Sequence, residues 1–261
     1  MASGVGIQSE FHDRQSQPAF GQPLGAEGGG DSGWGINAGV LLDLTDTTRV
    51  GLAYRSGVTY EIEGNVRFTP PTVANPIGAS IIAAASRPGG SLRDGAASVD
   101  LEMPDTVLLS LRQNISDRFE LLADVGRTGW SSIQEIRVVR DNGEIVSDTP
   151  AEWNDVMRYA LAGTWQVSPS LKLRAGIAYD GTEVPDRTRT PRLPDVTRQW
   201  LAVGARWQST DSLVADFGHA QLFADDAPLD QDNGNAAAYG LVNGHQASAI
   251  DIVGLQFAVR Y

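Results

Sequence analysis

The sequence has no cysteine, a single lysine and no long apolar run. Without cysteine it forms neither disulfides nor thiolate metal sites. Arginine supplies nearly all the positive charge, and 20 Lys and Arg against 32 Asp and Glu leave a net charge of −12. This balance argues against nucleic acid as a partner, because phosphate binding needs clustered cations. No stretch approaches the ~18–20 apolar residues of a membrane-spanning helix, so only strands of ~9–11 alternating residues could span a membrane.

The last residues of the chain, 250–261, alternate between two kinds of side chain. One face carries Val253, Leu255, Phe257, Val259 and Tyr261. The other carries Gly254, Gln256, Ala258 and Arg260. A period of two residues predicts a strand. An apolar face backed by a polar one is typical of a membrane barrel, whose apolar side meets lipid and whose polar side meets the lumen.

The same alternation recurs through the chain, in residues 4–11, 34–44, 49–68, 97–113, 119–140, 159–167, 171–180, 200–207 and 213–217. Short turns at residues 45–48, 114–117, 168–170 and 209–211 alternate with long connections at residues 69–96, 141–150, 181–194 and 224–244. The Asn142-Gly143 pair in one long connection is compatible with a type I′ turn. This order predicts an all-β fold, an antiparallel transmembrane β-barrel with short periplasmic turns and long extracellular loops.

A soluble antiparallel barrel or sandwich is the alternative to a membrane barrel, because it can meander in the same way. Four aromatic residues near strand ends favour the membrane, since they suit a girdle at the two membrane interfaces. They are Trp34, Trp165, Trp207 and Tyr261.

Five segments resemble the FadL/OmpP1/TodX family of outer-membrane transporters, at residues 34–56, 101–110, 130–136, 173–185 and 193–204. They read WGINAGVLLDLTDTTRVGLAYRS, LEMPDTVLLS, WSSIQEI, LRAGIAYDGTEVP and LPDVTRQWLAVG. The resemblance runs over nearly the whole chain and implies a barrel of about fourteen strands, plugged by an amino-terminal hatch. It also implies a location in the outer membrane of Gram-negative bacteria and uptake of long-chain fatty acids or aromatic hydrocarbons.

By that resemblance, residues 1–261 form a single partial barrel domain of about the last ten strands. The first residues have no basic region, apolar core or cleavage site of a signal peptide. We therefore expect the signal peptide, the hatch and the first strands of the barrel to belong to upstream sequence that is missing here.

Substrate binding is expected to combine apolar walls with a cation for a carboxylate head group. The alternation directs several cations into the lumen: Arg55, Arg158, Lys172, Arg174, Arg206 and Arg260. Three acids share that face and are expected to neutralise some of them: Glu61, Asp124 and Asp216. For each cation, an ion pair that merely holds the wall is the alternative to ligand binding.

The longest connection contains Ile77, Ile81 and Ile82 in an Ala-rich stretch with roughly helical spacing. A hydrophobic solute needs an apolar surface on which to dock outside the polar lipopolysaccharide layer, and these isoleucines are candidates for it. A helix that only covers the mouth of the barrel is the alternative.

Nothing in the sequence marks an enzyme, a cofactor site or a metal site. His245, Ser248 and Asp251 are close in sequence, but no nucleophile or oxyanion hole accompanies them. Loose divalent-ion binding by Asp225, Asp226, Asp230 and Asp232 stays open.

Two functions remain: a substrate-specific channel for hydrophobic compounds, and a nonspecific or structural porin with a hydrated lumen. The isoleucines favour the channel. Its expected partners are the substrate, outer-membrane lipid and lipopolysaccharide, and the barrel-assembly machinery, which would engage the carboxy-terminal strand.

Overall fold

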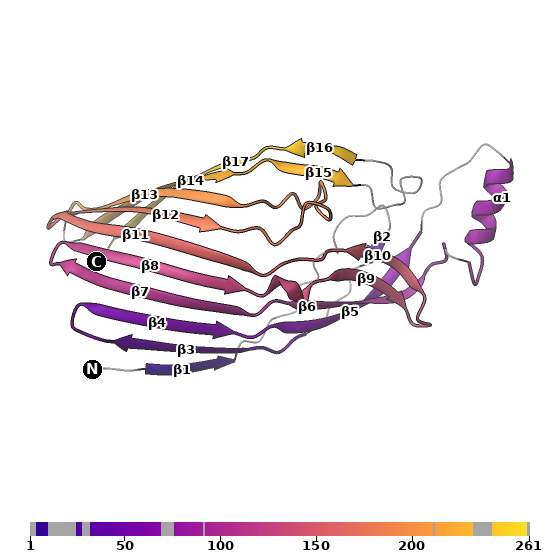
Figure 1. Ribbon diagram of the computed structural model, residues 1–261, viewed down its shortest axis with the longest axis horizontal. Helices are drawn as coiled ribbons and strands as arrows, with labels where there is room; N and C mark the ends of the chain where they lie inside the picture. The colour runs from indigo at the N-terminus through magenta and orange to yellow at the C-terminus, as the bar shows by residue number, and fades with distance from the viewer. Residues whose placement is uncertain are drawn as a thin grey trace.

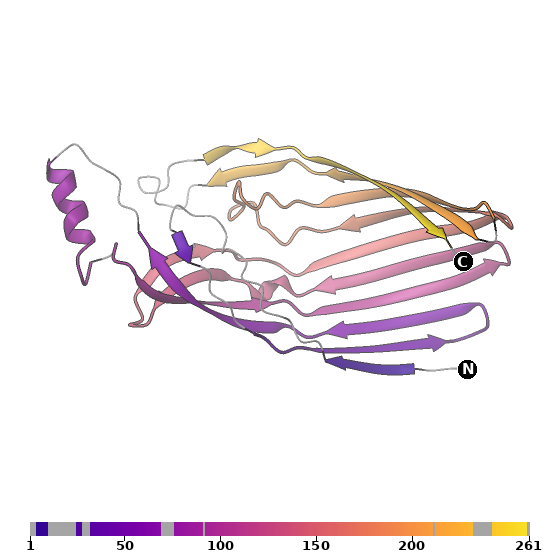
Figure 2. The same cartoon turned by 180° about the vertical axis from the view of Figure 1, so that it is seen from behind.

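A curved antiparallel sheet forms most of the protein (Figure 1). The computed structural model describes residues 4–9, 25–27, 32–68, 76–90, 92–210, 212–231 and 242–259. The sheet has ten strands, in the order β1-β3-β4-β7-β8-β11-β12-β13-β14-β17, as predicted. Their bounds are β1 Gly4–Ser9, β3 Ile36–Asp43, β4 Thr48–Arg55, β7 Thr106–Ser116, β8 Phe119–Thr128, β11 Val156–Ser168, β12 Leu171–Asp180, β13 Arg198–Gln208, β14 Leu213–Ala224 and β17 Ala249–Val259. Among the described strands, β1 and β17 have one neighbour each and lie at opposite margins of the open sheet (Figure 2).

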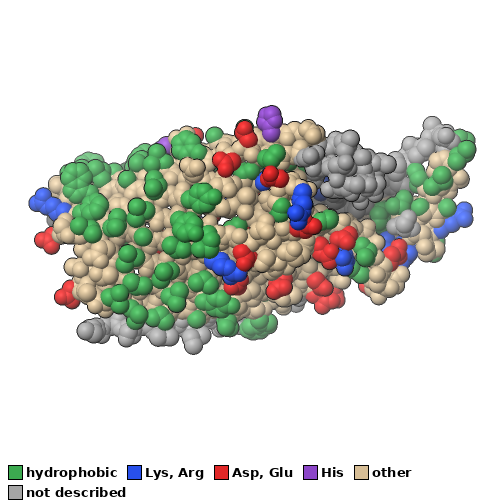
Figure 3. Space-filling model, in the orientation of Figure 1, with side chains coloured by type: hydrophobic (Ala, Val, Ile, Leu, Met, Phe, Trp, Pro, Cys, Tyr) green, Lys and Arg blue, Asp and Glu red, His purple; other side chains and the backbone are tan. Residues whose placement is uncertain are grey.

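The convex face of this sheet is apolar because the strand register aligns apolar residues across neighbouring strands. One such row crosses six strands through Val40, Leu52, Leu109, Val125, Tyr159 and Tyr179. Each of these side chains is at least 37% exposed. Figure 3 shows apolar side chains spread over this face, with charged ones mainly toward its two ends. A contiguous exposed apolar surface of this kind indicates contact with lipid.

Short turns and long connections lie at opposite ends of the strands, as predicted (Figure 1). The short turns join β3 to β4, β7 to β8, β11 to β12, and β13 to β14. Trp165 and Trp207 are exposed at the short-turn end, and Trp34 is exposed just before β3 at the long-loop end. These positions fit an aromatic girdle at each membrane interface. Tyr261 and Arg260 lie outside the described residues.

Three strands that the alternation predicts as continuous are each broken in the structure. Residues 49–68 form β4 and β5 (Val58–Arg67), and residues 97–113 fall in β6 (Gly95–Met103) and β7. Residues 119–140 fall in β8, the short helix η1 (Trp130–Ser132) and β9 (Glu135–Arg140). At the first break, a Cβ on Gly57 would lie 2.8 Å from the carbonyl oxygen of Met103, so only glycine fits that crossing. At the second break, Pro104 has no N–H to donate to a ladder.

Beyond these breaks the chain forms a second sheet at the long-loop end, in the order β10-β9-β6-β5-β2. The bounds are β2 Gly25–Glu27, β5 Val58–Arg67, β6 Gly95–Met103, η1 Trp130–Ser132, β9 Glu135–Arg140 and β10 Ile145–Pro150. Two segments interpreted as loops therefore contain strands: residues 12–32 contain β2, and residues 141–150 contain β10. In the β9–β10 turn, Gly143 has a φ of +80° but Asn142 does not have a positive φ, so the turn is not type I′.

The remaining long connections also contain ordered elements. Residues 224–244, interpreted as a loop, include β15 Ala227–Gln231 and the start of β16 Val242–Gln246, which pair with each other. Residues 69–96 include helix α1, Pro76–Ala85. None of the helices in the described ranges has the length and apolar character needed to cross a membrane.

Arg189 holds the connection between β12 and β13 against β15. Its guanidinium, 2% exposed, donates hydrogen bonds to the backbone oxygens of Asp195 (2.9 Å), Val184 (3.1 Å) and Pro228 (3.2 Å). It also pairs with the carboxylate of Asp186 at 2.6 Å. Apolar side chains of this connection, of β14 and of β15 are also buried: Val184, Val196, Leu222, Ala227 and Leu229. A guanidinium has enough donors to bind several backbone carbonyls at once, and these bonds fold the connection into an ordered unit. We call this unit, residues 181–197, the cap.

Glu183 lies in the same connection, next to the carboxylate of Asp195. Burial, together with a smaller effect of the neighbouring Asp195 charge, raises the pKa of the Glu183 carboxyl to about 7. Asp195 itself accepts a hydrogen bond from Thr182 Oγ1 at 2.8 Å and lies 3.0 Å from a guanidinium nitrogen of Arg198. Of these two carboxyl groups, Glu183 is thus the one that keeps its proton up to a pH of about 7.

Replacing Val203 with arginine should destabilise the folded protein by ~2–4 kcal/mol, the cost of an arginine facing lipid near the bilayer midplane. Val203 lies in the middle of β13 on the convex face. Gly218→Arg is the matched control, because Gly218 faces the lumen from β14 and a Cβ there meets nothing within 4 Å. Urea titration of folding into lipid vesicles measures both free energies. An equal loss of unfolding free energy in the two variants would contradict the assignment of Val203 to the lipid face and Gly218 to the lumen face.

The cap around Glu183 should become less stable as the pH rises from about 4.5 to about 7. Over this range the folded state retains a proton that the unfolded chain has lost, so stability falls with rising pH. Hydrogen exchange of residues 181–197, corrected for intrinsic rates, measures the effect, and Glu183→Gln should remove most of the pH dependence. Glu63→Gln is the control, because Glu63 is an exposed residue of β5 outside the cap, and it should leave the pH dependence unchanged. If the pH dependence of hydrogen exchange is the same in Glu183→Gln as in the wild type, Glu183 does not carry the raised pKa.

Candidate functional site

The concave face of the main sheet is lined along its middle by small residues. One row runs through Ala162, Gly176, Ala202 and Ala220, directly opposite one another on four consecutive strands. A second joins Gly204, Gly218 and Gly254. At these positions the concave face carries smaller side chains than the convex face, because the alternation that sends large apolar residues to lipid leaves glycine and alanine inside. The middle of the lumen wall is therefore weakly polar along these strands.

Ion pairs line the concave face nearer the short turns. Asp216 on β14 accepts three hydrogen bonds from Arg206, at 2.8, 2.9 and 3.1 Å, and one from Arg174 at 3.4 Å. Further pairs join Asp43 to Arg49 and Arg112 to Glu120. Two of the predicted lumen cations, Arg174 and Arg206, are thus brought together by one carboxylate. This is the arrangement expected of charges that hold a wall.

The other predicted charges are distributed differently. Lys172 sits opposite Arg206 near the short turns, and Arg55 ends β4 near the long loops. Neither forms an ion pair with a residue that the structure describes. Of the predicted acids, Asp124 likewise has no ion pair within the described residues, and Glu61 lies in β5 of the second sheet. The structure therefore does not gather the predicted cations into one cluster.

Arg158 lies at the long-loop end of β11, stacked on a tryptophan. Its guanidinium carbon is 5.6 Å from the centre of the Trp200 ring, which projects from β13. The indole Nε1 of Trp200 is buried and has no hydrogen-bond partner among the described residues. The alternation in the sequence puts Trp200 on the lumen face, but it does not link Trp200 to Arg158. That contact depends on the pairing of β12 with both neighbouring strands, in which Ala178 lies directly opposite Trp200 and Asp180 directly opposite Arg158.

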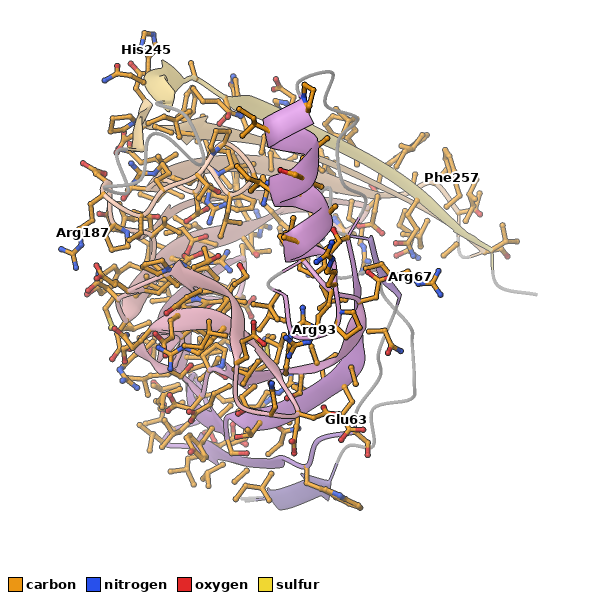
Figure 4. The ribbon with its side chains drawn as sticks, turned by 90° about the vertical axis from the view of Figure 1, so that its right-hand side faces the viewer. Glu63, Arg67, Arg93, Arg187, His245 and Phe257 are labelled. Carbon is orange, nitrogen blue, oxygen red and sulfur yellow. The ribbon has the colours of Figure 1, made fainter. Side chains whose placement is uncertain are left out.

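The predicted docking isoleucines lie on α1, beyond the long-loop end of the sheet (Figures 1 and 4). Ile77 is 70% and Ile81 62% exposed, whereas Ile82 is partly covered. The helix contains no charged residue. After it the chain turns back so that the N–H of Leu92 bonds the carbonyl of Ala85 at 2.9 Å. A Cβ on Gly90 would lie 2.1 Å from that carbonyl oxygen, so this turn requires glycine.

Figure 4 shows the protein from its long-loop end, so that the concave and outer faces of the sheet can be distinguished. α1 crosses in front of the concave face, whereas Arg187 and Phe257 point away from it. An apolar helix thus stands at the end of the trough formed by the sheet.

One other cavity has an acidic lining, which disfavours an anionic ligand. A cavity of about 220 Å³ lies between the second sheet and η1, and three of its lining residues are acids, Asp100, Glu102 and Glu135. No group of three metal-ligating side chains occurs among the described residues. For the aspartates considered above, the side chains of Asp230 and Asp232 fall outside what the structure describes.

Known proteins share both the sequence and the fold. The sequence profile of the outer membrane protein transport protein family (OMPP1/FadL/TodX) matches residues 22–261. A long-chain fatty acid transport protein of Escherichia coli O6:H1 is 28% identical over 81% of this chain and 46% of its own length. Outer membrane protein P1 of Haemophilus influenzae is 30% identical over 73% of this chain and 38% of its own length. The chain thus spans less than half of these relatives.

Solved structures support the fold. A Pseudomonas aeruginosa FadL homologue superposes with a TM-score of 0.75 and 24% identity over 98% of this chain and 61% of that one. The toluene transporter TodX of Pseudomonas putida superposes with a TM-score of 0.52 and 18% identity over 99% of this chain and 55% of that one. Two of these relatives are named transporters, and one is named an outer membrane protein. The apolar convex face, the placement of short turns and long loops, and the match over residues 22–261 show that the chain belongs to the OMPP1/FadL/TodX family of bacterial outer-membrane transport proteins.

Proposed function

We propose that the chain forms the wall of an outer-membrane channel that takes up hydrophobic compounds such as long-chain fatty acids or aromatic hydrocarbons. The observation that carries this proposal is the lumen wall. Its middle is lined by alanine and glycine in register, between ion pairs toward the short turns and Arg158 and Arg55 toward the long loops. A weakly polar wall costs a hydrophobic solute little, whereas a nonspecific porin needs a polar lumen that holds water.

α1 contributes the dock in this proposal. The exposed side chains of Ile77 and Ile81 stand on an uncharged helix beyond the end of the sheet, where a solute from outside would arrive first. Exposing such an apolar surface to water is unfavourable, so its presence here needs a functional reason. The names of the relatives agree, since one is a long-chain fatty acid transport protein and another a toluene transporter.

The same proposal covers the domain and the partners. Residues 1–261 act as one wall domain, with the second sheet extending the strands of the main sheet outward. The convex face contacts outer-membrane lipid, its long-loop end meets lipopolysaccharide, and β17 is the strand offered to the barrel-assembly machinery.

Binding measurements on the purified protein in lipid nanodiscs test the function. A labelled long-chain acid or a monoaromatic hydrocarbon should bind saturably, and Ile77→Ser/Ile81→Ser should slow capture roughly 10-fold, since each isoleucine loses part of its ~1.5–3 kcal/mol of burial energy. Ala79→Ser/Ala83→Ser on the same helix is the matched control and should bind at the wild-type rate. Ohmic conductance without saturable binding would contradict the proposal and indicate a porin.

A further inference from the structure

We propose that Arg140 is a positioning residue for the capture of hydrophobic solutes: it joins the two ends of the connection that carries α1, and so holds the exposed isoleucines of that helix in front of the trough. This inference rests on the proposed function, because it names the residue that places the dock.

Helix α1 contributes no buried side chain that would fix its position. None of the residues Pro76–Ala85, all of which the structure describes, is buried. A helix is normally held against the rest of a protein by burial of an apolar face. What keeps α1 in front of the concave face (Figure 4) must therefore act on the chain before and after the helix.

Arg140 contacts the chain on both sides of α1. It is the last residue of β9, and its side chain is only 4% exposed. Before the helix, the guanidinium carbon of Arg140 lies 5.7 Å from the centre of the Phe68 ring, a cation–π distance. After the helix, Nη2 of Arg140 donates a hydrogen bond of 2.6 Å to the backbone oxygen of Arg93. We call these three residues, Phe68, Arg93 and Arg140, the clamp.

Further contacts tie the clamp to the β9–β10 hairpin. The N–H of Phe68 donates a hydrogen bond of 2.9 Å to a carboxylate oxygen of Asp94, so the two ends of the connection also contact each other directly. Arg93, labelled in Figure 4, forms an ion pair of 2.6 Å with Glu144. Glu144 lies in the turn between β9 and β10 and accepts a backbone hydrogen bond of 2.9 Å from Arg140. The second sheet therefore supplies the anchor for α1.

The clamp limits the positions that α1 can take. Losing it would lengthen the part of the connection that is free to move, and the conformational freedom of a loop increases with its length. A solute docks only while α1 stands in front of the trough, so capture should fall by the fraction of time that the helix spends elsewhere. Arg140 would thus act on capture through α1 without touching the solute.

Arg137 on the same strand provides a matched control. It forms ion pairs with Glu135 at 2.7 Å and with Asp148 at 3.3 Å. Both partners belong to β9 and β10, and neither lies in the connection that carries α1. Arg137 and Arg140 are three residues apart on a strand, so their side chains lie on opposite faces.

Distances between two spin labels test the clamp on the protein in lipid nanodiscs. One label replaces Ala83 on α1 and the other Thr149 on β10, since both positions are exposed and the chain has no cysteine of its own. Without further substitution the two labels should give one narrow distance distribution. Arg140→Met should broaden it, Phe68→Leu should broaden it less because only the ring contact is lost, and Arg137→Met should leave it unchanged.

Arg140→Met is chosen because the folded protein should tolerate it. Methionine keeps an unbranched apolar side chain, and Glu144 keeps its ion pair with Arg93, so no buried charge is left without a partner. Heat-dependent mobility on electrophoresis checks that each variant is folded. Arg140→Lys, which retains the charge and loses the forked donors, replaces Arg140→Met if the latter is not.

Capture kinetics distinguish positioning from a general loss of structure. After rapid mixing with a labelled long-chain acid, Arg140→Met should capture severalfold more slowly, by no more than the roughly 10-fold expected for Ile77→Ser/Ile81→Ser. The dissociation constant should stay unchanged, because a dock at the entrance speeds entry and release alike. A partly unfolded protein would instead bind less acid at saturation. Adding Arg140→Met to Ile77→Ser/Ile81→Ser should slow capture no further, since the dock is already lost.

The possible failures of the clamp and of the channel differ. A distance distribution that stays narrow in both Arg140→Met and Phe68→Leu would overturn the clamp while the channel stands. An unchanged capture rate in Arg140→Met, or a further loss of rate when it is added to Ile77→Ser/Ile81→Ser, would do the same. If the wild type shows no saturable binding, or if Ile77→Ser/Ile81→Ser captures at the wild-type rate, the proposed dock fails and the role of Arg140 in capture fails with it.

Discussion

The structure depends on backbone hydrogen bonding in a medium without water. Inside a bilayer each N–H and C=O needs a partner within the protein, and neighbouring strands supply these partners only when paired in register. Register then decides which side chains share a face, because side chains alternate with a strict period of two. The row from Val40 to Tyr179 on the convex face is one consequence, and the row from Ala162 to Ala220 on the concave face is the other.

Register also assembles the chemistry of the lumen. Arg206 and Asp216 are directly opposite on β13 and β14, so their ion pair follows from pairing alone. Arg158 faces Asp180, yet Arg198 on the next strand takes that acid. The wall therefore contains both neutralised charges, which hold it together, and three cations that form no ion pair among the described residues: Arg55, Arg158 and Lys172.

The sequence predicts much of this fold because alternation is a local signal. The main-sheet strands, the ends at which turns and loops lie, and the helical character of residues 76–85 all follow from patterns within a few residues. The alternation does not predict the breaks in the strands at Gly57 and Pro104. The need for glycine at position 57 arises from the carbonyl oxygen of Met103, which lies on another strand. The contact of Trp200 with Arg158 does not follow from the sequence, because local periodicity carries no information on contacts across an intervening strand. The cap around Arg189 depends on Pro228, far along the chain, and was missed for the same reason.

The most direct test of the account is an accessibility scan of β13 with single-cysteine spin labels, which is clean because the chain has no cysteine of its own. Labels at Leu201, Val203 and Ala205 should be relaxed by oxygen dissolved in the lipid. Labels at Ala202 and Gly204 should be relaxed instead by a water-soluble nickel complex. A two-residue alternation with this phase would support a strand with one face in lipid and one in the lumen. No alternation, or alternation with the opposite phase, would contradict it.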